Sequence, residues 1–149
     1  MRQDKKKCRQ GDEALGRSRG GYTTKVHVTV DALGNPRRIM LSAGQVHDLQ
    51  VAPYLIEHEQ TQAIVADKAY DSNEFIALIE QLGAVVVIPP KANRIEQREY
   101  DKNLYADRNK VERFFNRVKH YRRLATRYEK TARNYLAFWQ VACSVVLTL

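Results

Sequence analysis

Two short apolar segments that flank one amphipathic helix constrain the fold most strongly. Residues 62–67 (QAIVAD) and 84–90 (AVVVIPP) have the aliphatic composition of buried strands, and prolines end the second. Residues 71–83 between them have helical spacing and end at a glycine. The apolar face of this helix consists of Phe75, Ile76, Leu78, Ile79 and Leu82. A strand, helix and strand in this order predict a parallel pair with a right-handed crossover.

An antiparallel hairpin is predicted upstream of this unit. Residues 25–30 (KVHVTV) alternate apolar and polar side chains, residues 31–36 (DALGNP) have turn composition, and residues 37–44 (RRIMLSAG) follow. Residues 49–59 then have helical spacing. Together these segments predict an α/β fold in which an antiparallel hairpin edges a partly parallel sheet.

The two ends of the chain are predicted to differ in character. Residues 1–21 are polar, basic and glycine-rich, which indicates a basic arm or loop without a strand, and residues 22–149 are predicted to form one domain. The two cysteines, Cys8 and Cys143, lie far apart, which indicates a reducing cytoplasm and no zinc site. The apolar segment 131–149 is shorter than the ~20 residues that span a bilayer, so a core helix with Trp139 and Phe138 inside is expected.

The charge is unevenly distributed along the chain. The formal net charge is +8, and both residues 1–25 and residues 108–133 are strongly basic, whereas the segment between them is acidic. This pattern favours an anionic partner, nucleic acid first, although a solvated surface could also have it. In the first basic segment, Arg17 and Arg19 either hold phosphates or belong to a solvated loop. In the second, added nonspecific DNA affinity is expected from Arg122, Arg123, Arg127, Lys130 and Arg133.

A basic helix predicted over residues 105–123 carries a single acid, Glu112, in its middle. At about 100° per residue, one polar stripe of this helix contains Tyr105, Arg108, Glu112 and Lys119. An ion pair between Arg108 and Glu112 would account for the acid and is worth a few tenths of a kcal/mol. Metal or phosphate binding along the stripe is the other interpretation.

Asp67 ends the predicted strand 62–67, and ligands bind beyond the carboxyl ends of strands in open α/β sheets. A carboxylate there suits a hard cation such as Mg²⁺. Asp71 or Ser72 can cap the helix 71–83, and Asp71 with Glu74 has the spacing of a capping box. Asp67 is therefore expected to have no structural task.

Three further residues have two interpretations each. His47 and Asp48 form a pair that could bind metal or phosphate, whereas Asp48 could instead cap the helix 49–59. Lys91 follows the double proline and could reach DNA, although nothing in its own segment favours that role.

The pattern Tyr105-x2-Arg108-x3-Glu112-x6-Lys119 resembles the YREK motif of bacterial insertion-sequence transposases of the DDE class. Residues 67–70 (DKAY) are similar to the element around the second aspartate of that family. The stretches GRSRGGYTTKVHVTVDALGNP, GQVHD and VIPPKANR are also similar to that family. The resemblance runs from about Gly11 to the C-terminus, and the order of its motifs is more specific than any one of them.

The resemblance implies a ribonuclease-H-like fold in which two aspartates and a glutamate hold two Mg²⁺ ions for attack on a phosphodiester. It implies that Asp67 and Glu112 are catalytic metal ligands, and that Tyr105, Arg108 and Lys119 contact DNA. Transposon ends and target DNA would be the partners, together with another copy or an upstream-frame product, at the nucleoid in the bacterial cytoplasm.

The first aspartate of the family ends a central hydrophobic strand that residues 1–21 do not match. Asp4 and Asp12 have polar surroundings, and Asp31 matches the hairpin turn. The chain is therefore expected to be a C-terminal portion that lacks the first central strand and is inactive alone. Two alternatives are a non-catalytic DNA-binding or partner-binding regulator of transposition, and a ribonuclease-H-like nuclease outside transposition. The spacing from Tyr105 to Lys119 argues against the nuclease.

Overall fold

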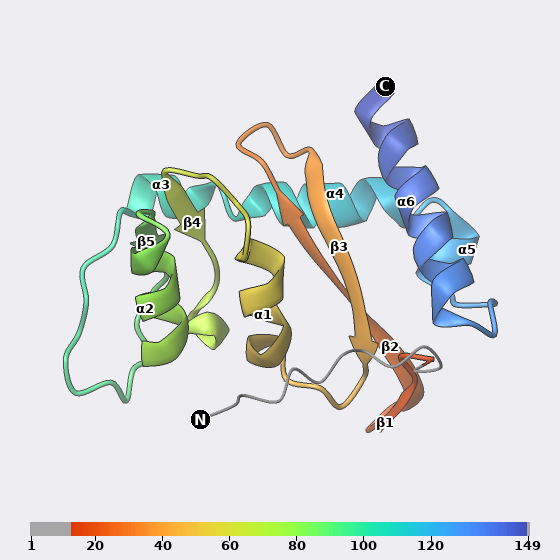
Figure 1. Ribbon diagram of the computed structural model, residues 1–149, viewed down its shortest axis with the longest axis horizontal. Helices are drawn as coiled ribbons and strands as arrows, with labels where there is room; N and C mark the ends of the chain where they lie inside the picture. The colour runs from red at the N-terminus through yellow and green to blue at the C-terminus, as the bar shows by residue number, and fades with distance from the viewer. Residues whose placement is uncertain (1–12, 149) are drawn as a thin grey trace.

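The computed structural model describes residues 13–148, which form a mixed α/β fold with two separate sheets (Figure 1). The first sheet is antiparallel and contains β1 (Gly16–Ser18), β2 (Gly21–Val30) and β3 (Pro36–Ala43). The second is a parallel pair of β4 (Ala63–Val65) and β5 (Val85–Val87). The prediction of an antiparallel hairpin, a parallel pair and helices is confirmed, but within residues 13–148 the hairpin does not edge the parallel pair, because no ladder joins the two sheets.

The β2–β3 hairpin forms around the turn that the sequence predicts. Val28 lies opposite Ile39 in the register, and the Asp31 carboxylate accepts hydrogen bonds from the backbone N–H groups of Leu33 and Asn35. Gly34 has a φ of 87°, a conformation that glycine adopts without steric cost. Asp31 therefore has the turn role expected of it.

The predicted basic arm contains a strand in the part that the structure describes. Strand β1 pairs with the start of β2, with Arg17 opposite Tyr22, through a two-residue turn of Arg19 and Gly20. Gly21, with a φ of 100°, allows this tight reversal, so the prediction of no strand before residue 22 is wrong. Asp4, Asp12 and Cys8 lie outside the described residues.

The parallel pair is joined by α2 (Asn73–Gln81), as predicted. The N-cap is Ser72, whose hydroxyl accepts a hydrogen bond from Phe75 N at 3.2 Å. The capping box of Asp71 and Glu74 is therefore wrong, because the Asp71 side chain is buried and bonds elsewhere. One hydrophobic core lies beneath α2 and α1 (Asp48–Ile56), and its buried residues are Val51, Ala52, Leu55, Ile56, Phe75, Ile79, Ala84 and Ile88.

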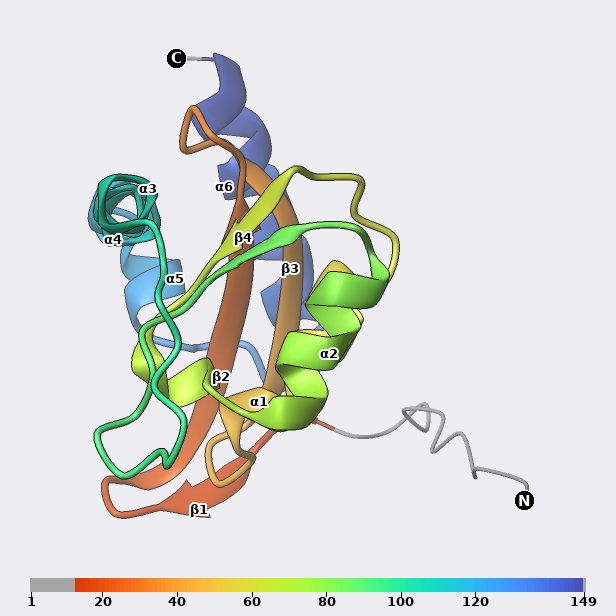
Figure 2. The same ribbon diagram turned by 90° about the vertical axis from the view of Figure 1, so that its left-hand side faces the viewer.

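A second core lies under α6 (Ala132–Thr148). Its buried residues are Phe114, Val118, Leu124, Tyr135, Trp139, Ala142, Cys143 and Val146. Alternate residues of β2, such as Val26 and Val28, pack against this core, whereas Met40 of β3 packs against the first. Trp139 is buried as predicted, but Phe138 is 38% exposed and belongs to the outer face of α6. In Figure 2 the strands lie between α1 and α2 on one side and α3 and α4 on the other.

The predicted basic helix is divided into α3 (Lys102–Ala106), α4 (Asn109–Val118) and α5 (Arg122–Ala125). Between α3 and α4 the hydrogen bonds shorten to three-residue spacing, from Arg108 N to Tyr105 O and from Lys110 N to Asp107 O. One continuous helix over 105–123 is therefore wrong. Among residues 13–148, no helix combines the length and apolar composition that crossing a membrane requires.

Candidate functional site

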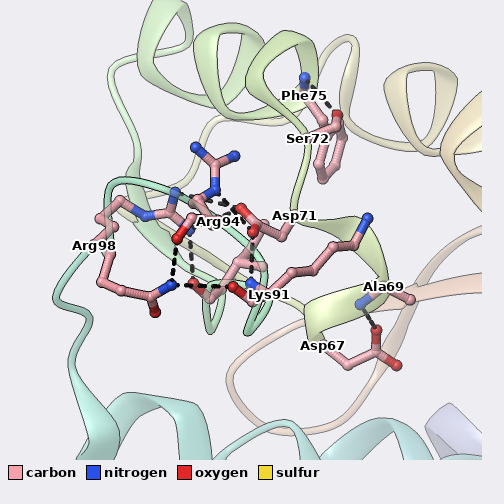
Figure 3. Close-up of polar contacts among 10 residues, drawn as sticks. Asp67, Ala69, Asp71, Ser72, Phe75, Lys91, Arg94 and Arg98 are labelled. Atoms are coloured by element: carbon pink, nitrogen blue, oxygen red, sulfur yellow. Dashed lines mark hydrogen bonds and ion pairs between the residues drawn. The ribbon is translucent and has the colours of Figure 1, made fainter.

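Asp67 directly follows β4 and begins a short 3₁₀ helix, η1 (Lys68–Tyr70). Its Oδ1 accepts a hydrogen bond from Ala69 N at 2.7 Å, so Asp67 caps η1 and the expectation that it has no structural task is wrong. Within residues 13–148, Oδ2 has no hydrogen bond or ion pair. Figure 3 shows the carboxylate directed away from that of Asp71. One carboxylate oxygen of Asp67 is therefore available to a partner from beyond residues 13–148.

Tyr70 closes η1 beside this carboxylate. Burial raises the pKa of Tyr70 to about 12, and the charges of Asp48 and Asp67 act in the same direction. The phenol therefore stays protonated at neutral pH. Its ring lies 6.1 Å from that of Phe75, which anchors η1 against α2.

Glu112 lies in the first turn of α4 and forms the ion pair that its spacing allows. Arg108 Nη2 lies 2.9 Å from Glu112 Oε1, and both side chains are well exposed. The guanidinium carbon of Arg108 lies 5.9 Å from the centre of the Tyr105 ring. The structure therefore brings together Tyr105, Arg108 and Glu112 at one end of α4.

The remaining predicted DNA contacts lie at the other end of α4. Lys119 is the C-cap of α4, and its Nζ lies 3.4 Å from Asn116 Oδ1. Arg122 and Arg123 lie on α5, where the Arg123 guanidinium stacks 5.3 Å from the centre of the Phe138 ring. The polar stripe is thus divided into two basic groups rather than one cluster.

Asp67 and Glu112 have carboxylate oxygens, which suit a hard cation. However, residues 13–148 contain no group of three or more His, Cys, Asp or Glu side chains that could hold a metal ion. The donor chemistry of the two carboxylates fits Mg²⁺, but they do not form a complete ligand set in the described part of the chain.

Asp48 does not cap α1, and its side chain forms an ion pair. The helix begins at Asp48 with His47 as N-cap and without a side-chain cap, so the capping interpretation is wrong. Lys25 Nζ instead lies 3.0 Å from Asp48 Oδ1 and donates to Val46 O at 2.8 Å. This ion pair ties β2 to the start of α1.

His27 and Ser42 form a buried polar pair on the α1 side of the hairpin. His27 Nε2 lies 2.7 Å from Ser42 Oγ. Burial lowers the pKa of His27, Asp48 opposes that shift, and Lys25 adds to it. The neutral imidazole is therefore the folded form at neutral pH.

Arg127, expected to add DNA affinity, is instead a structural side chain that is only 10% exposed. It donates to Glu13 O at 2.7 Å and to Thr24 Oγ1 at 2.6 Å, and its guanidinium lies 5.5 Å from the centre of the Tyr135 ring. These contacts tie the segment before β1 to β2 and α6.

The polar cluster that sequence reasoning missed is centred on Asp71, whose side chain is 1% exposed (Figure 3). Asp71 Oδ2 accepts hydrogen bonds from Lys91 N at 2.8 Å and from Arg94 Nε at 2.9 Å, and Arg98 Nη2 lies 3.5 Å from Oδ1. Burial alone would raise the pKa of Asp71, but the hydrogen bonds from Arg94 and Lys91 and the two guanidinium charges outweigh it and lower the pKa. The available sequence signal was the run of cations after the double proline, together with an acid that the helix cap did not need.

The fold and site define an α/β domain with one acid at the end of a parallel strand and another on a basic helix. A model of the transposase DDE domain family matches residues 2–147. The chain is 36% identical over 126 residues to a protein of Brucella ovis named as a transposase for insertion sequence element IS6501, covering 83% of this chain and 97% of that protein. It is 26% identical over 148 residues to a Burkholderia cepacia protein named as a transposase for IS402, covering 91% of this chain and 67% of that protein. No solved structure matches.

The chain belongs to the transposase DDE domain family, the DDE class of insertion-sequence transposases.

Proposed function

We propose that the chain is the C-terminal part of a ribonuclease-H-like transposase catalytic domain, which cleaves and joins DNA at insertion-sequence ends. Family membership is the first support. The single structural observation that carries the proposal is the division of the strands into two sheets. No ladder joins β2 to β4 within residues 13–148, and beyond Thr23 strand β2 pairs only with β3. One further strand between the two sheets would satisfy both edges.

Asp67 and Glu112 are the residues that we propose as metal ligands. Each has one carboxylate oxygen without a hydrogen bond or ion pair within residues 13–148. Mg²⁺ bound there would supply activation of a water or a DNA 3′ hydroxyl for in-line attack. The third ligand, the first aspartate of the family, would come from the additional strand, so this chain alone is proposed to be inactive.

Tyr105 and Arg108 are proposed to bind DNA near Glu112. Arg108 presents a planar fork that suits phosphate oxygens, and the Tyr105 ring limits its movement. Because the Arg108–Glu112 pair is exposed, exchanging the carboxylate for a phosphate costs little. Lys119, Arg122 and Arg123 are proposed to hold the DNA backbone farther along α4 and α5.

The alternative function is a regulator that occupies transposon ends, or joins the full-length protein, without chemistry. The same basic residues and strand edges would serve it. The two functions differ in their need for Glu112, because DNA binding requires no carboxylate whereas metal-dependent cleavage does.

The test combines this chain with an upstream segment that supplies the missing strand and aspartate, on DNA carrying the ends of the element and in Mg²⁺. We expect cleavage or joining by the assembled protein, no activity from this chain alone, and loss of activity with Glu112→Gln but retained DNA binding. Chain-alone activity would contradict the proposed missing ligand. Binding and repression without cleavage in any assembly would favour the regulator.

A further inference from the structure

The loop after β5 is held to the rest of the domain by the buried carboxylate of Asp71. Three donors from this loop, Lys91 N, Arg94 Nε and the Arg98 guanidinium, surround that carboxylate. Arg98 Nη2 also donates to Ile88 O at 2.7 Å. A polar loop with these anchors is fixed in place although it lies outside regular secondary structure.

The parallel register brings this loop to the same edge as Asp67. Val65 of β4 lies opposite Val87 of β5, and Ala66 N continues the ladder to Val87 O at 3.2 Å. Asp67 therefore leaves β4 at the edge where the chain turns from β5 toward Lys91. The intervening Pro89 and Pro90 restrict the backbone there.

We call the Asp71 carboxylate with its three donors, Lys91 N, Arg94 and Arg98, the Asp71 clasp. The clasp fixes the backbone of Lys91 but leaves the Lys91 side chain without a partner among the described residues. Arg94 and Arg98 are drawn toward Asp71, whereas the Lys91 ammonium has no hydrogen bond or ion pair with any part of the described chain. In Figure 3 the Lys91 side chain extends away from the Asp71 carboxylate, toward the η1 segment that follows Asp67. Of the three cations in the clasp segment, Lys91 is the one left for an external anion.

We propose that Asp71 is a positioning residue whose buried carboxylate fixes the Lys91 backbone, so that the Lys91 ammonium, on the η1 side of the loop, contacts a phosphate of bound DNA. This inference rests on the proposed function, which places DNA at the carboxyl end of β4. A lysine suits the position because its compact charge binds a single phosphate oxygen on a flexible stem. The fixed backbone at Lys91 N limits the volume that this stem can sample.

The experiment measures how binding of a short duplex of arbitrary sequence to the full chain depends on salt. Removal of one phosphate contact lowers the slope of log affinity against log salt by about 0.9. We expect this loss for Lys91→Ala, and an unchanged slope for Lys91→Arg. Lys102→Ala is the matched control, because Lys102 is exposed and its side chain has no hydrogen bond or ion pair within residues 13–148. A slope that Lys91→Ala leaves unchanged, or that Lys102→Ala lowers equally, would overturn the inference.

Asp71→Asn tests the positioning. This substitution makes the chain more positive, so general electrostatics alone would strengthen DNA binding. We expect the opposite, a fall in slope toward that of Lys91→Ala, and no further fall in the double variant, because both changes remove the same contact. Additive losses, or tighter binding by Asp71→Asn, would show that the clasp is only structural.

Two further measurements keep the inference testable if Asp71→Asn does not fold or if the chain does not bind the duplex. Arg94→Gln removes one of the two charged partners of Asp71 but leaves Arg98 and the bond from Lys91 N, and it should give a partial fall in slope. Amine-reactive labelling of the wild-type chain should show Lys91 protected by the duplex, and an unprotected Lys91 would count against the inference. A wild-type chain that binds no duplex would overturn the proposed DNA-binding function as well, whereas normal binding that is independent of Lys91 would overturn this inference alone.

Discussion

The Arg108 guanidinium lies 2.9 Å from the Glu112 carboxylate, at the start of α4. Exposed pairs at this spacing stabilise a helix by only a few tenths of a kcal/mol, because water screens both charges. The pair partly neutralises the charge of Glu112 on a basic surface but holds its side chain in place only weakly. Either partner can then be released to DNA or to a cation at small cost.

Arg108→Ala should therefore separate binding from stability. The free energy of unfolding should change by less than about 1 kcal/mol, since the pair is exposed. DNA affinity should fall and its salt slope should decrease by about 0.9, since one phosphate contact is lost. Urea unfolding and a salt series of binding measurements check both values. A large loss of stability with unchanged binding would assign Arg108 a structural role.

Asp71→Asn should change the response of the protein to acid. The folded pKa of Asp71 lies below its usual value. Its contribution to stability is therefore present above the unfolded pKa of about 3.9 and is lost as the pH falls through the folded pKa. The variant should be less stable at pH 7 by about 3 kcal/mol, because two guanidinium groups lose their partner.

The difference between wild type and Asp71→Asn should then shrink below about pH 4, where the unfolded wild-type chain takes up a proton at Asp71 before the folded protein does. Urea unfolding at several pH values measures this convergence. A difference that stays constant down to the acid limit would show that the Asp71 charge does not stabilise the fold.

The role of Asp71 shows which part of the fold the sequence alone does not predict. Helix α2 and the β2–β3 hairpin were predictable, because apolar spacing and the turn residues Asp31 and Gly34 act locally. The choice between Asp71 and Ser72 as the N-cap of α2 was not predictable, because both side chains can accept a hydrogen bond from a backbone N–H. Arg94 and Arg98, more than 20 residues away, decide the choice by drawing Asp71 into the interior.

The candidate site shows the same division between local and distant information. The pairing of Arg108 with Glu112 follows from spacing within one turn and was predictable. The break between α3 and α4 was not, since Asp107 and Arg108 are compatible with a continuous helix and the change to three-residue hydrogen bonds is subtle. The capping role of Asp67 arises from η1, a single 3₁₀ turn that has no periodic pattern to detect.

His27 predicts a second pH effect, at milder acidity. Its pKa is lowered in the folded protein, so the unfolded chain binds a proton first as the pH falls. Stability should therefore decrease below the unfolded pKa of about 6.5. His27→Gln, which cannot take up that proton, should show a weaker decrease between pH 7.5 and pH 5.5 in urea unfolding. Equal slopes for both proteins would exclude His27 as the source.

Two phenylalanines test the position of the second core. Phe114 is fully buried, so Phe114→Ala should lower the free energy of unfolding by about 3–5 kcal/mol. Phe138 is 38% exposed, and its replacement by Ala should cost clearly less. Thermal or urea unfolding of the two variants measures the contrast. Equal losses would mean that α6 packs through Phe138 as well.

The unpaired strand edges predict that the isolated chain associates with itself. Among residues 13–148, strand β4 pairs only with β5, and β2 beyond Thr23 pairs only with β3, so each leaves backbone groups that a second copy can bond. The net charge of +8 opposes this association. Added salt should therefore strengthen it by screening the repulsion. If basic segments of one copy instead bound the acidic segment of another, salt would weaken association. Sedimentation velocity over a range of protein and salt concentrations separates the two, and a chain that stays monomeric with a cooperative, highly stable melt would contradict the exposed edges.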